Sequence, residues 1–218
     1  MKPAHALLLF LVAAPPRTRE LQAVASSALC GANGRLASAP TDHQLHIDAG
    51  ALRAFIADDH SAIAEIAFTY RGPSKVEAPL ANGELRRQIG LKLRARDTCN
   101  VVYVMWHVEP SPGVSVSVKH NPSTGTHRGC GAGGYINVQP EAGRRAPAIL
   151  RGTPHVLRAE LEGRELRVTA DGVVVWRGPL PAEAFAFDGP AGLRSDNGVF
   201  DLELRVPGGA AGAHCPPW

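Results

Sequence analysis

Residues 157–176 read LRAELEGRELRVTADGVVVW and contain the clearest strand pattern of the chain. Apolar residues alternate with charged ones from Leu157 to Leu161 and again from Leu166 to Val168, on either side of Glu162-Gly163-Arg164. A period of two on both sides of a Gly-containing turn is the pattern of a β-hairpin. Asp171-Gly172 is a typical two-residue hairpin turn, and a third strand follows it to Trp176. The stretch therefore predicts three consecutive antiparallel strands.

Outward from this stretch, strand patterns cover most of the chain. Alternating or continuous apolar runs predict strands over residues 64–70, 88–96, 101–108, 114–118, 135–138 and 200–206. Ser195-Asp196-Asn197-Gly198 has the composition of a turn before the last of them. Ala51–Ser61 favours a short helix, and Pro181–Phe185 favours a helical turn. The chain is therefore predicted to be all-β.

The paired hairpins of residues 157–176, together with the closing run Gly189-Pro190-Ala191-Gly192-Leu193-Arg194, carry a family resemblance. They resemble the jelly rolls of the concanavalin A-like lectin and glucanase superfamily, which includes laminin G-like domains. The resemblance covers about 50 residues well and the central strands by pattern only. It implies a two-sheet antiparallel jelly-roll sandwich. Because this scaffold carries lectins, β-glucanases, polysaccharide lyases and adhesion modules, function has to be argued from a site.

Length and composition fit one folded domain. The chain has 218 residues, of which 44% are apolar and 20% charged. We assign residues 1–28 to a signal peptide and lead-in, 29–41 to a linker segment, 42–207 to the sandwich and 208–218 to a C-terminal tail. The net charge is +3 without a run of Lys or Arg, so no nucleic acid is expected as a partner.

The N-terminus has the pattern of an export signal. Lys2 precedes the apolar stretch Ala6–Ala14, and cleavage is expected among the small residues of Ala23–Ala28. No segment approaches the roughly 20 apolar residues that cross a bilayer, so no membrane span is predicted. The protein is therefore expected to be secreted, in a periplasmic or extracellular location.

The cysteines are Cys30, Cys99, Cys130 and Cys215. In an exported chain an even number predicts two disulfides, for which three pairings exist. We favour Cys99–Cys130, which closes a Gly-rich loop, and Cys30–Cys215, which joins the two ends of the domain. Zinc is a weaker alternative, because no Cys-x-x-Cys occurs and the candidate ligands are confined to His120, His127 and Cys130.

A candidate ligand-binding site lies on the polar faces of the strands in residues 88–138. Sugar sites combine an aromatic platform with a few hydrogen-bonding side chains in a groove. The residues that we predict to bind the ligand are Gln88, Lys92, Arg94, Tyr103, His107, Lys119, His120 and Tyr135. Trp106 and Trp176 we assign to the core, because they lie in strands whose burial removes much apolar area from water.

The same residues include the types that a polysaccharide lyase needs. In such an enzyme a Tyr or His abstracts the proton next to a uronate carboxylate, while Arg and Gln neutralise that carboxylate. Tyr135 after Gly133-Gly134 resembles the Gly-x-Tyr strand of alginate lyases. Their Gln-Ile-His motif, however, reads Gln88-Ile89-Gly90 here, so the expected base is missing from that place.

Other chemistry has less support in the sequence. Retaining glycoside hydrolysis needs two nearby carboxylates, and the nearest match, Glu160 to Glu165, is interrupted by the turn at Gly163. That run is better explained as the solvated face of a hairpin. No cofactor is predicted, although calcium is possible at Asp58-Asp59 or Asp196-Asn197.

We therefore expect a secreted carbohydrate-binding, lectin-like or adhesion module whose partner is a polysaccharide or glycoconjugate. The first alternative is a polysaccharide-degrading enzyme of the jelly-roll type, foremost a lyase acting on an acidic polysaccharide. The second is a structural or protein-interaction domain without a sugar ligand. Whether the protein is an enzyme stays open at this point.

Overall fold

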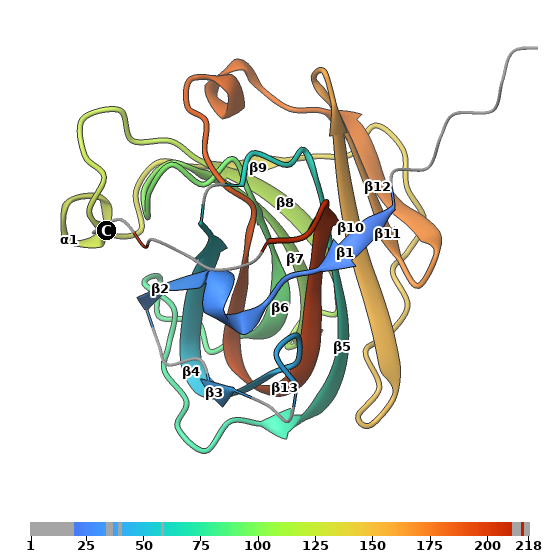
Figure 1. Ribbon diagram of the computed structural model, residues 1–218. Helices are drawn as coiled ribbons and strands as arrows, with labels where there is room; N and C mark the ends of the chain where they lie inside the picture. Colours follow the sequence, from blue (N-terminus) through green and yellow to red (C-terminus); the bar gives the residue numbers. More distant parts are fainter. Residues whose placement is uncertain (1–19, 34–36, 39–40, 58, 211–214, 216–218) are drawn as a thin grey trace, which may run out of the picture.

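The computed structural model describes residues 20–33, 37–38, 41–57, 59–210 and 215, and strands dominate it (Figure 1). The strands are β1 (Leu21–Ala23), β2 (Leu29–Asn33), β3 (Ala37–Ser38), β4 (Leu45–Ile56), β5 (Ile63–Pro73), β6 (Arg87–Leu93), β7 (Val101–Glu109), β8 (Gly113–Lys119), β9 (Tyr135–Val138), β10 (Pro154–Glu162), β11 (Glu165–Ala170), β12 (Val173–Pro179) and β13 (Gly192–Pro207). The helical elements are α1 (His127–Cys130) and the 3-10 turns η1 (Ser26–Ala28) and η2 (Ala182–Phe185). The prediction of an all-β chain is confirmed.

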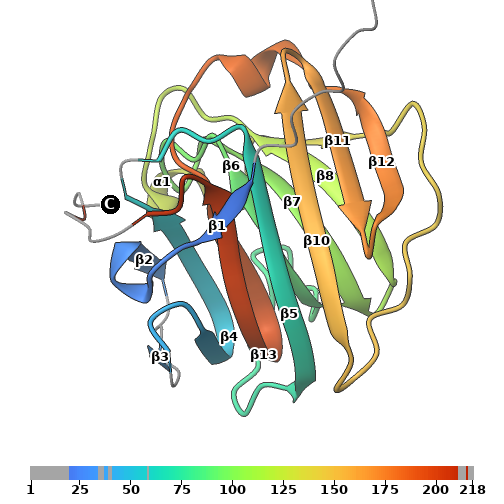
Figure 2. The same ribbon diagram turned by 45° about the vertical axis from the view of Figure 1, so that its right-hand side comes forward.

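The strands form two layers that share β13. One layer has the order β13-β6-β7-β8-β9 and the other the order β13-β5-β10-β11-β12. In Figure 2, β5, β10, β11 and β12 lie side by side, and β6, β7 and β8 form the layer behind them. Strand β4 pairs along the remaining edge of β13, and the short strands β1, β2 and β3 pair with β13 or β4.

β13 passes from one layer to the other along its length. Gly192–Asp196 pairs with β6 and Gly198–Arg205 pairs with β5, while β4 accompanies the opposite edge from Gly192 to Leu202. Asn197 at the switch has a φ of 56°, which Asn tolerates better than most non-glycine residues. The turn predicted at residues 195–198 is therefore wrong: the strand bends there, but its continued pairing with β4 prevents it from ending.

The hydrophobic core lies between the two layers. The alternating apolar residues of β6, β7 and β8 meet those of β5, β10 and β11 in one buried cluster. Trp106 is fully buried, its ring packs edge-on against Phe68 at 5.7 Å, and its Nε1 donates to the carbonyl oxygen of Pro147. Trp176 is also buried, so both assignments to the core are confirmed. Strand alternation then directs the intervening polar side chains of β6, β7 and β8 to the opposite face of their layer.

The helix predicted for Ala51–Ser61 is wrong, because most of this segment belongs to β4. Leu52, Ala54 and Ile56 are fully buried, and the strand pairs residue by residue with β13. Pairing of this kind overrides the helix propensity of an Ala-containing segment. The predicted helical turn near residues 181–185 is confirmed as η2.

The N-terminal residues 21–33, which the sequence assigns to a lead-in and linker, contribute strands to the sandwich. β1 pairs with β13, β2 pairs with β4, and Val24 and Ala28 are buried in the main core. The packed part of the chain therefore begins earlier than residue 42. The export signal predicted for the N-terminus lies largely in residues 1–19, outside the described residues, whereas its expected cleavage region lies in this packed segment.

Two disulfides cross-link the sandwich. Cys99 bonds to Cys130 and Cys30 bonds to Cys215, which are the two pairs favoured from the sequence. In the part of the chain that the structure describes, no helix has the length and apolar character of a membrane span.

Candidate functional site

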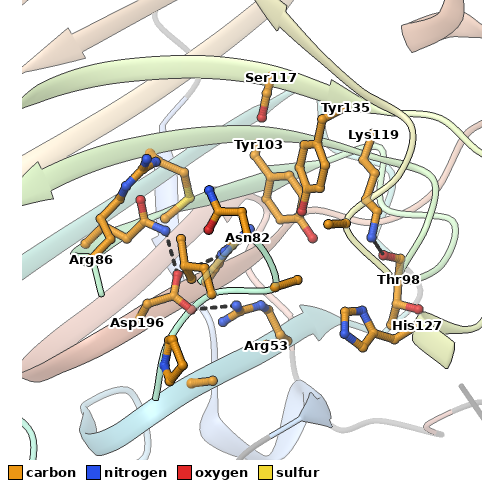
Figure 3. Close-up of a pocket in the computed structure, with 18 of the residues that line it drawn as sticks. Arg53, Asn82, Arg86, Thr98, Tyr103, Ser117, Lys119, His127, Tyr135 and Asp196 are labelled. Atoms are coloured by element: carbon orange, nitrogen blue, oxygen red, sulfur yellow. Dashed lines mark hydrogen bonds and ion pairs between the residues drawn. The ribbon is translucent and has the colours of Figure 1, made fainter. Parts of the chain in front are cut away.

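A groove of about 760 Å³ lies on the face of the β6–β9 layer that points away from the core (Figure 3). Its floor comes from β4, β6, β7, β8, β9 and β13, and its walls come from residues 78–82 and from α1 and the residues after it. A volume of this size fits a small-molecule or oligosaccharide ligand. The lining residues are Gly50, Ala51, Arg53, Ala78, Pro79, Leu80, Ala81, Asn82, Arg86, Gln88, Lys92, Thr98, Tyr103, Met105, Ser115, Ser117, Lys119, His127, Gly131, Ala132, Tyr135, Asn137, Arg194 and Asp196.

Strand alternation explains the polar floor. Gln88 and Lys92 line the groove, while Ile89 and Leu91 between them are buried in the core. Gly90 has no side chain to contribute, and a Cβ built there would lie 2.1 Å from the carbonyl oxygen of Val104 and 2.8 Å from Cα of the next residue on β7. A larger residue at position 90 would therefore push β6 and β7 apart beneath the groove.

Tyr103 of β7 and Tyr135 of β9 form an aromatic wall. Their ring centroids are 6.1 Å apart at an interplanar angle of 22°. Tyr103 is 4% exposed and Tyr135 is 41% exposed. The guanidinium of Arg194 lies 4.9 Å from the Tyr103 centroid, and the ammonium of Lys119 lies 5.1 Å from the Tyr135 centroid. Tyr135 is thus the aromatic ring that a ligand in the groove can reach.

Asp196 is the centre of a buried ionic cluster. Its Oδ1 accepts a hydrogen bond from Arg53 at 2.5 Å, and its Oδ2 accepts from Gln88 Nε2 at 2.6 Å and from Arg194 Nε at 2.9 Å. Burial alone would raise the pKa of Asp196, but the charges of Arg194 and Arg53 outweigh burial and hold the pKa below its usual value. The carboxylate is therefore ionised and anchors both guanidinium groups.

Two lysines extend this cluster across the floor. Lys92 and Lys119 are each 1% exposed, and Lys119 Nζ donates to the carbonyl oxygens of Gly131 at 2.8 Å and Thr98 at 3.4 Å. Burial lowers the pKa of Lys92 to about 7, with Arg53 and Arg194 acting in the same direction. Burial and the same two arginines lower the pKa of Lys119 to about 8. The basic side chains of the groove therefore lie close enough to repel one another, and this repulsion, together with burial, makes both lysines lose their protons more readily than usual.

Asn197 ties one wall of the groove to β13. Its Oδ1 accepts from the backbone N–H of Ala78 at 2.7 Å, and its Nδ2 donates to the carbonyl oxygens of Ala78 at 2.9 Å and Arg86 at 3.0 Å. Since Asn197 follows Asp196 directly, the bend in β13 positions both the ionic cluster and the wall at residues 78–82.

The opposite wall belongs to the Gly-rich segment 120–134, which is fixed at two points. Cys130 is bonded to Cys99 just before β7, and fully buried Asn100 exchanges hydrogen bonds with the backbone of Asn121. Gly131, which accepts the hydrogen bond from Lys119, directly follows the disulfide. The disulfide therefore holds a residue of the groove in place.

Replacing Cys99 and Cys130 together by serine is expected to weaken both the fold and the groove. Closing a 31-residue interval with a disulfide is worth roughly 3 to 4 kcal/mol on the chain-entropy model. Urea unfolding should show a loss of that order, and binding of any groove ligand should weaken because Gly131 loses its anchor. The matched control is the Cys30–Cys215 pair, because neither of its cysteines lines the groove. Its replacement should cost stability and leave binding intact; equal effects of both pairs on binding would contradict this role.

Comparisons with known proteins bear on the fold. No protein-family model and no curated protein sequence matches the chain. Among solved structures, a carbohydrate-binding module from Bacillus subtilis superposes with a TM-score of 0.56 at 14% identity, over 81% of this chain and 92% of that one. A putative glycosyl hydrolase from Parabacteroides distasonis gives a TM-score of 0.48 at 11% identity over 86% and 98%. A tetrameric galectin from the ball sponge Cinachyrella sp. gives 0.44 at 9% over 72% and 99%.

The fold is a concanavalin A-like jelly roll. This result agrees with the resemblance carried by residues 157–176 and 189–194. Function on such a scaffold still depends on the residues of the site.

Five of the eight ligand-binding residues predicted from the sequence line the groove of this jelly roll: Gln88, Lys92, Tyr103, Lys119 and Tyr135. His107 follows Tyr103 and Met105 on the same face of β7 but lies beyond the lining, with its Nε2 2.8 Å from Ser115 Oγ. Burial, assisted by the charge of Arg86, lowers the pKa of His107 to about 4, so this imidazole is neutral at physiological pH.

Arg94 and His120 lie outside the groove lining, next to the segment around η2. Arg94 donates to the carbonyl oxygens of Ala184 at 3.0 Å and Phe187 at 2.6 Å, and the ring of His120 packs 5.9 Å from the ring of Phe187. Both residues directly follow the end of a strand, β6 and β8 respectively. The alternation that assigned them to the polar face no longer holds there; Arg94 has a φ of 53°.

Four charged residues of the groove lining were not predicted to bind the ligand: Arg53, Arg86, Arg194 and Asp196. Arg53 is in a segment predicted to be a helix and Asp196 in a segment predicted to be a turn, so the sequence gives no sign that both lie on one face of a sheet. Continuing the alternation of β13 would have placed Arg194 and Asp196 on one face together.

The structure also locates the weaker candidates. Glu160 lies on the β10–β11 hairpin in the other layer, where it accepts hydrogen bonds from Arg158 at 2.6 Å and Arg167 at 3.0 Å. Among the described residues that line the groove, Asp196 is the single carboxylate, and both of its oxygens accept hydrogen bonds. The described residues of the groove therefore do not include the pair of carboxylates that retaining hydrolysis needs.

The metal candidates have other partners. Cys130 is in a disulfide and cannot supply a thiolate to zinc. Asp59 accepts hydrogen bonds from the Ser61 hydroxyl and the backbone N–H of Ala191, and Asp58 lies outside the described residues. Within the described ranges, no group of three or more His, Cys, Asp or Glu side chains could hold a metal ion.

Proposed function

We propose that this jelly roll binds carbohydrate in the groove of the β6–β9 layer. The observation that carries the proposal is the combination of a half-exposed Tyr135 with polar side chains around one open cavity. A sugar ring presents a C–H face that packs on an aromatic ring and a rim of hydroxyls that need hydrogen-bond partners. Tyr135 supplies the first, and Asn82, Ser117 and Asn137 line the same space and supply the second.

Two further observations support the proposal. The Bacillus subtilis protein is a carbohydrate-binding module, and it shares this fold over most of its length. The two disulfides fit an oxidising compartment, where soluble glycan-binding domains meet polysaccharides. We therefore propose a secreted protein whose partner is a polysaccharide or glycoconjugate.

A lyase is the second candidate, and one contact favours it. The Tyr103 ring lies 4.9 Å from the guanidinium of Arg194, which is the combination of a proton acceptor and a carboxylate-neutralising cation that β-elimination requires. Against it, burial raises the pKa of the Tyr103 hydroxyl, although Arg194 opposes that effect. A base with a raised pKa is mostly protonated at neutral pH, so binding without turnover is the better-supported function.

A glycan-array screen of the oxidised protein tests both candidates at once. Retention of a defined glycan without product supports the binding module. Ultraviolet absorbance from an unsaturated uronate, read in the same wells, identifies a lyase. Silence in both channels refutes the proposal and favours a domain that contacts protein instead.

Replacing Tyr135 by alanine is expected to weaken glycan binding about tenfold or more, as truncation of a central aromatic anchor does elsewhere. Tyr135→Phe should keep most of the affinity, because it retains the ring. Leu150→Ala is the control: Leu150 is 59% exposed and outside the groove lining, so its truncation should leave binding unchanged. Calorimetric titration with the glycan found on the array measures all three. Unchanged binding by Tyr135→Ala would refute the aromatic platform.

A further inference from the structure

Basic side chains outnumber carboxylates along the groove. Its described lining contains Arg53, Arg86, Lys92, Lys119 and Arg194, against Asp196 alone. Arg86 forms an ion pair with Glu84 beside the groove. The other four are deeply placed, with Arg53 the most exposed at 18% of its side-chain surface. The floor of the groove is therefore a buried cationic surface.

The strand register brings two of these cations directly together. Arg53 of β4 and Arg194 of β13 are opposite each other in the antiparallel pair. Like charges in opposite positions destabilise a sheet unless a counter-charge separates them, and Asp196 provides one carboxylate for both guanidinium groups. Lys92 and Lys119 add two further basic groups. The positive charges of Arg53 and Arg194 disfavour the protonated form of each lysine, and the negative charge of Asp97 favours it.

Such a cluster is costly for an empty groove. Charges that repel in a poorly solvated site lower stability, and natural proteins keep arrangements of this kind where function requires them. The ligand that relieves the repulsion is an anion. The position of Lys119 suggests that the anion is a substituent of the bound sugar, because the Lys119 ammonium is 5.1 Å from the ring centroid of Tyr135. A sugar stacked on Tyr135 would have its substituents within reach of this ammonium.

We infer that the groove recognises an acidic glycan, with a carboxylate or sulfate group held by Lys92, Lys119 and Arg194 while the sugar ring packs on Tyr135. The inference rests on the proposed carbohydrate binding and adds the chemical class of the ligand. Carboxylate and sulfate share the geometry that ammonium and guanidinium groups bind, so the test must separate uronate from sulfated sugars.

The test compares three families of oligosaccharide on the full, oxidised chain by isothermal calorimetry. One family is built of uronates, such as oligogalacturonate; one is sulfated, such as carrageenan oligosaccharides; one is neutral, such as β-glucan oligosaccharides. At least one acidic family should bind tenfold or more tightly than the neutral one, with an affinity that falls as salt is added. The family that binds identifies the anion as carboxylate or sulfate.

Variants separate the groove from general attraction by a basic protein. Lys119→Met and Lys92→Met should each weaken acidic-glycan binding about tenfold or more. Lys75→Met removes the same charge from a side chain that is 90% exposed and lies outside the groove lining, and it should change affinity by less than about twofold. Near-ultraviolet circular dichroism establishes that each variant is folded. The salt dependence of the unaltered protein needs no variant.

The outcomes distinguish the two proposals. Neutral glycans that bind as tightly as acidic ones, with no effect of Lys92→Met or Lys119→Met, would overturn the acidic ligand and keep the carbohydrate-binding function. Equal weakening by Lys75→Met would also overturn it, because the attraction would then be unspecific. If no glycan of any family binds, the proposed function itself fails and this inference fails with it.

Discussion

Asp196→Asn is expected to lower the free energy of unfolding by about 3 to 5 kcal/mol, the range seen when one partner of a buried ion pair is removed. The substitution keeps the shape of the side chain and deletes its charge. Two guanidinium groups, those of Arg53 and Arg194, would then face each other across β4 and β13 without their shared anion. The Asn amide would also place a donor where the carboxylate accepts hydrogen bonds.

Asp201→Asn is the matched control, because it makes the same change on the same strand. Asp201 pairs with His46 and Arg71, but its side chain is 43% exposed and water screens both contacts. Its loss should cost less than about 1 kcal/mol. Chemical unfolding of the two variants at pH 7 makes the comparison. Equal losses of unfolding free energy would show that burial of the Asp196 cluster does not strengthen its contribution to stability.

Acid should act on Asp196 in the same direction as the substitution. Its pKa in the folded state is below the unfolded value, because Arg194 and Arg53 outweigh the opposing effect of burial. A group with a lowered folded-state pKa stabilises the protein above its unfolded pKa and loses that contribution as the pH falls through the folded one. The gap between the unaltered protein and Asp196→Asn should therefore close in strong acid.

The local sequence pattern is sufficient to predict which side chains of β6 and β7 point into the groove. Because side chains alternate on a strand, Gln88 and Lys92 were predicted to share a face of β6, and Tyr103 was predicted to lie on the polar face of its neighbour. The hairpins around Gly163 and Asp171-Gly172 were equally local, since both turns use backbone angles that those residues favour. The prediction of a carbohydrate-binding face therefore rests on the two-residue alternation of the strands and on the residues of the hairpin turns.

The ionic cluster was beyond the reach of local pattern. Arg53 meets Arg194 across a separation of more than a hundred residues, and that contact depends on the register of β4 against β13. Register between distant strands is set by the whole core rather than by either segment. The composition around Asn197 predicts a turn, but the strand continues there because β13 stays paired with β4 along its other edge. The residues that meet where β13 passes between the layers can therefore be identified only from the tertiary structure.

Lys92→Met is expected to raise the free energy of unfolding by roughly 1 to 3 kcal/mol at pH 6, because it removes a charge that burial and the guanidinium groups of Arg53 and Arg194 disfavour. Lys92 is 1% exposed, and burial together with Arg53 and Arg194 lowers its pKa to about 7. The unfolded chain holds this proton up to a pKa of 10.5, so below about pH 7 the folded state must keep a buried ammonium. Methionine has a similar length and no charge.

The sign of this effect gives the measurement. Between pH 7 and 10.5 the unfolded state binds more protons at Lys92 than the folded state, so the stability of the unaltered protein rises with pH in that window. Urea unfolding at pH 6 and pH 9 should therefore show a large advantage of Lys92→Met at pH 6 and a smaller one at pH 9. Lys75→Met, whose side chain is 90% exposed, should show neither. A variant that is more stable and yet loses acidic-glycan binding would show that the buried lysine is kept for its ligand; a variant that is destabilised at pH 6 would show that packing around Lys92 dominates its charge.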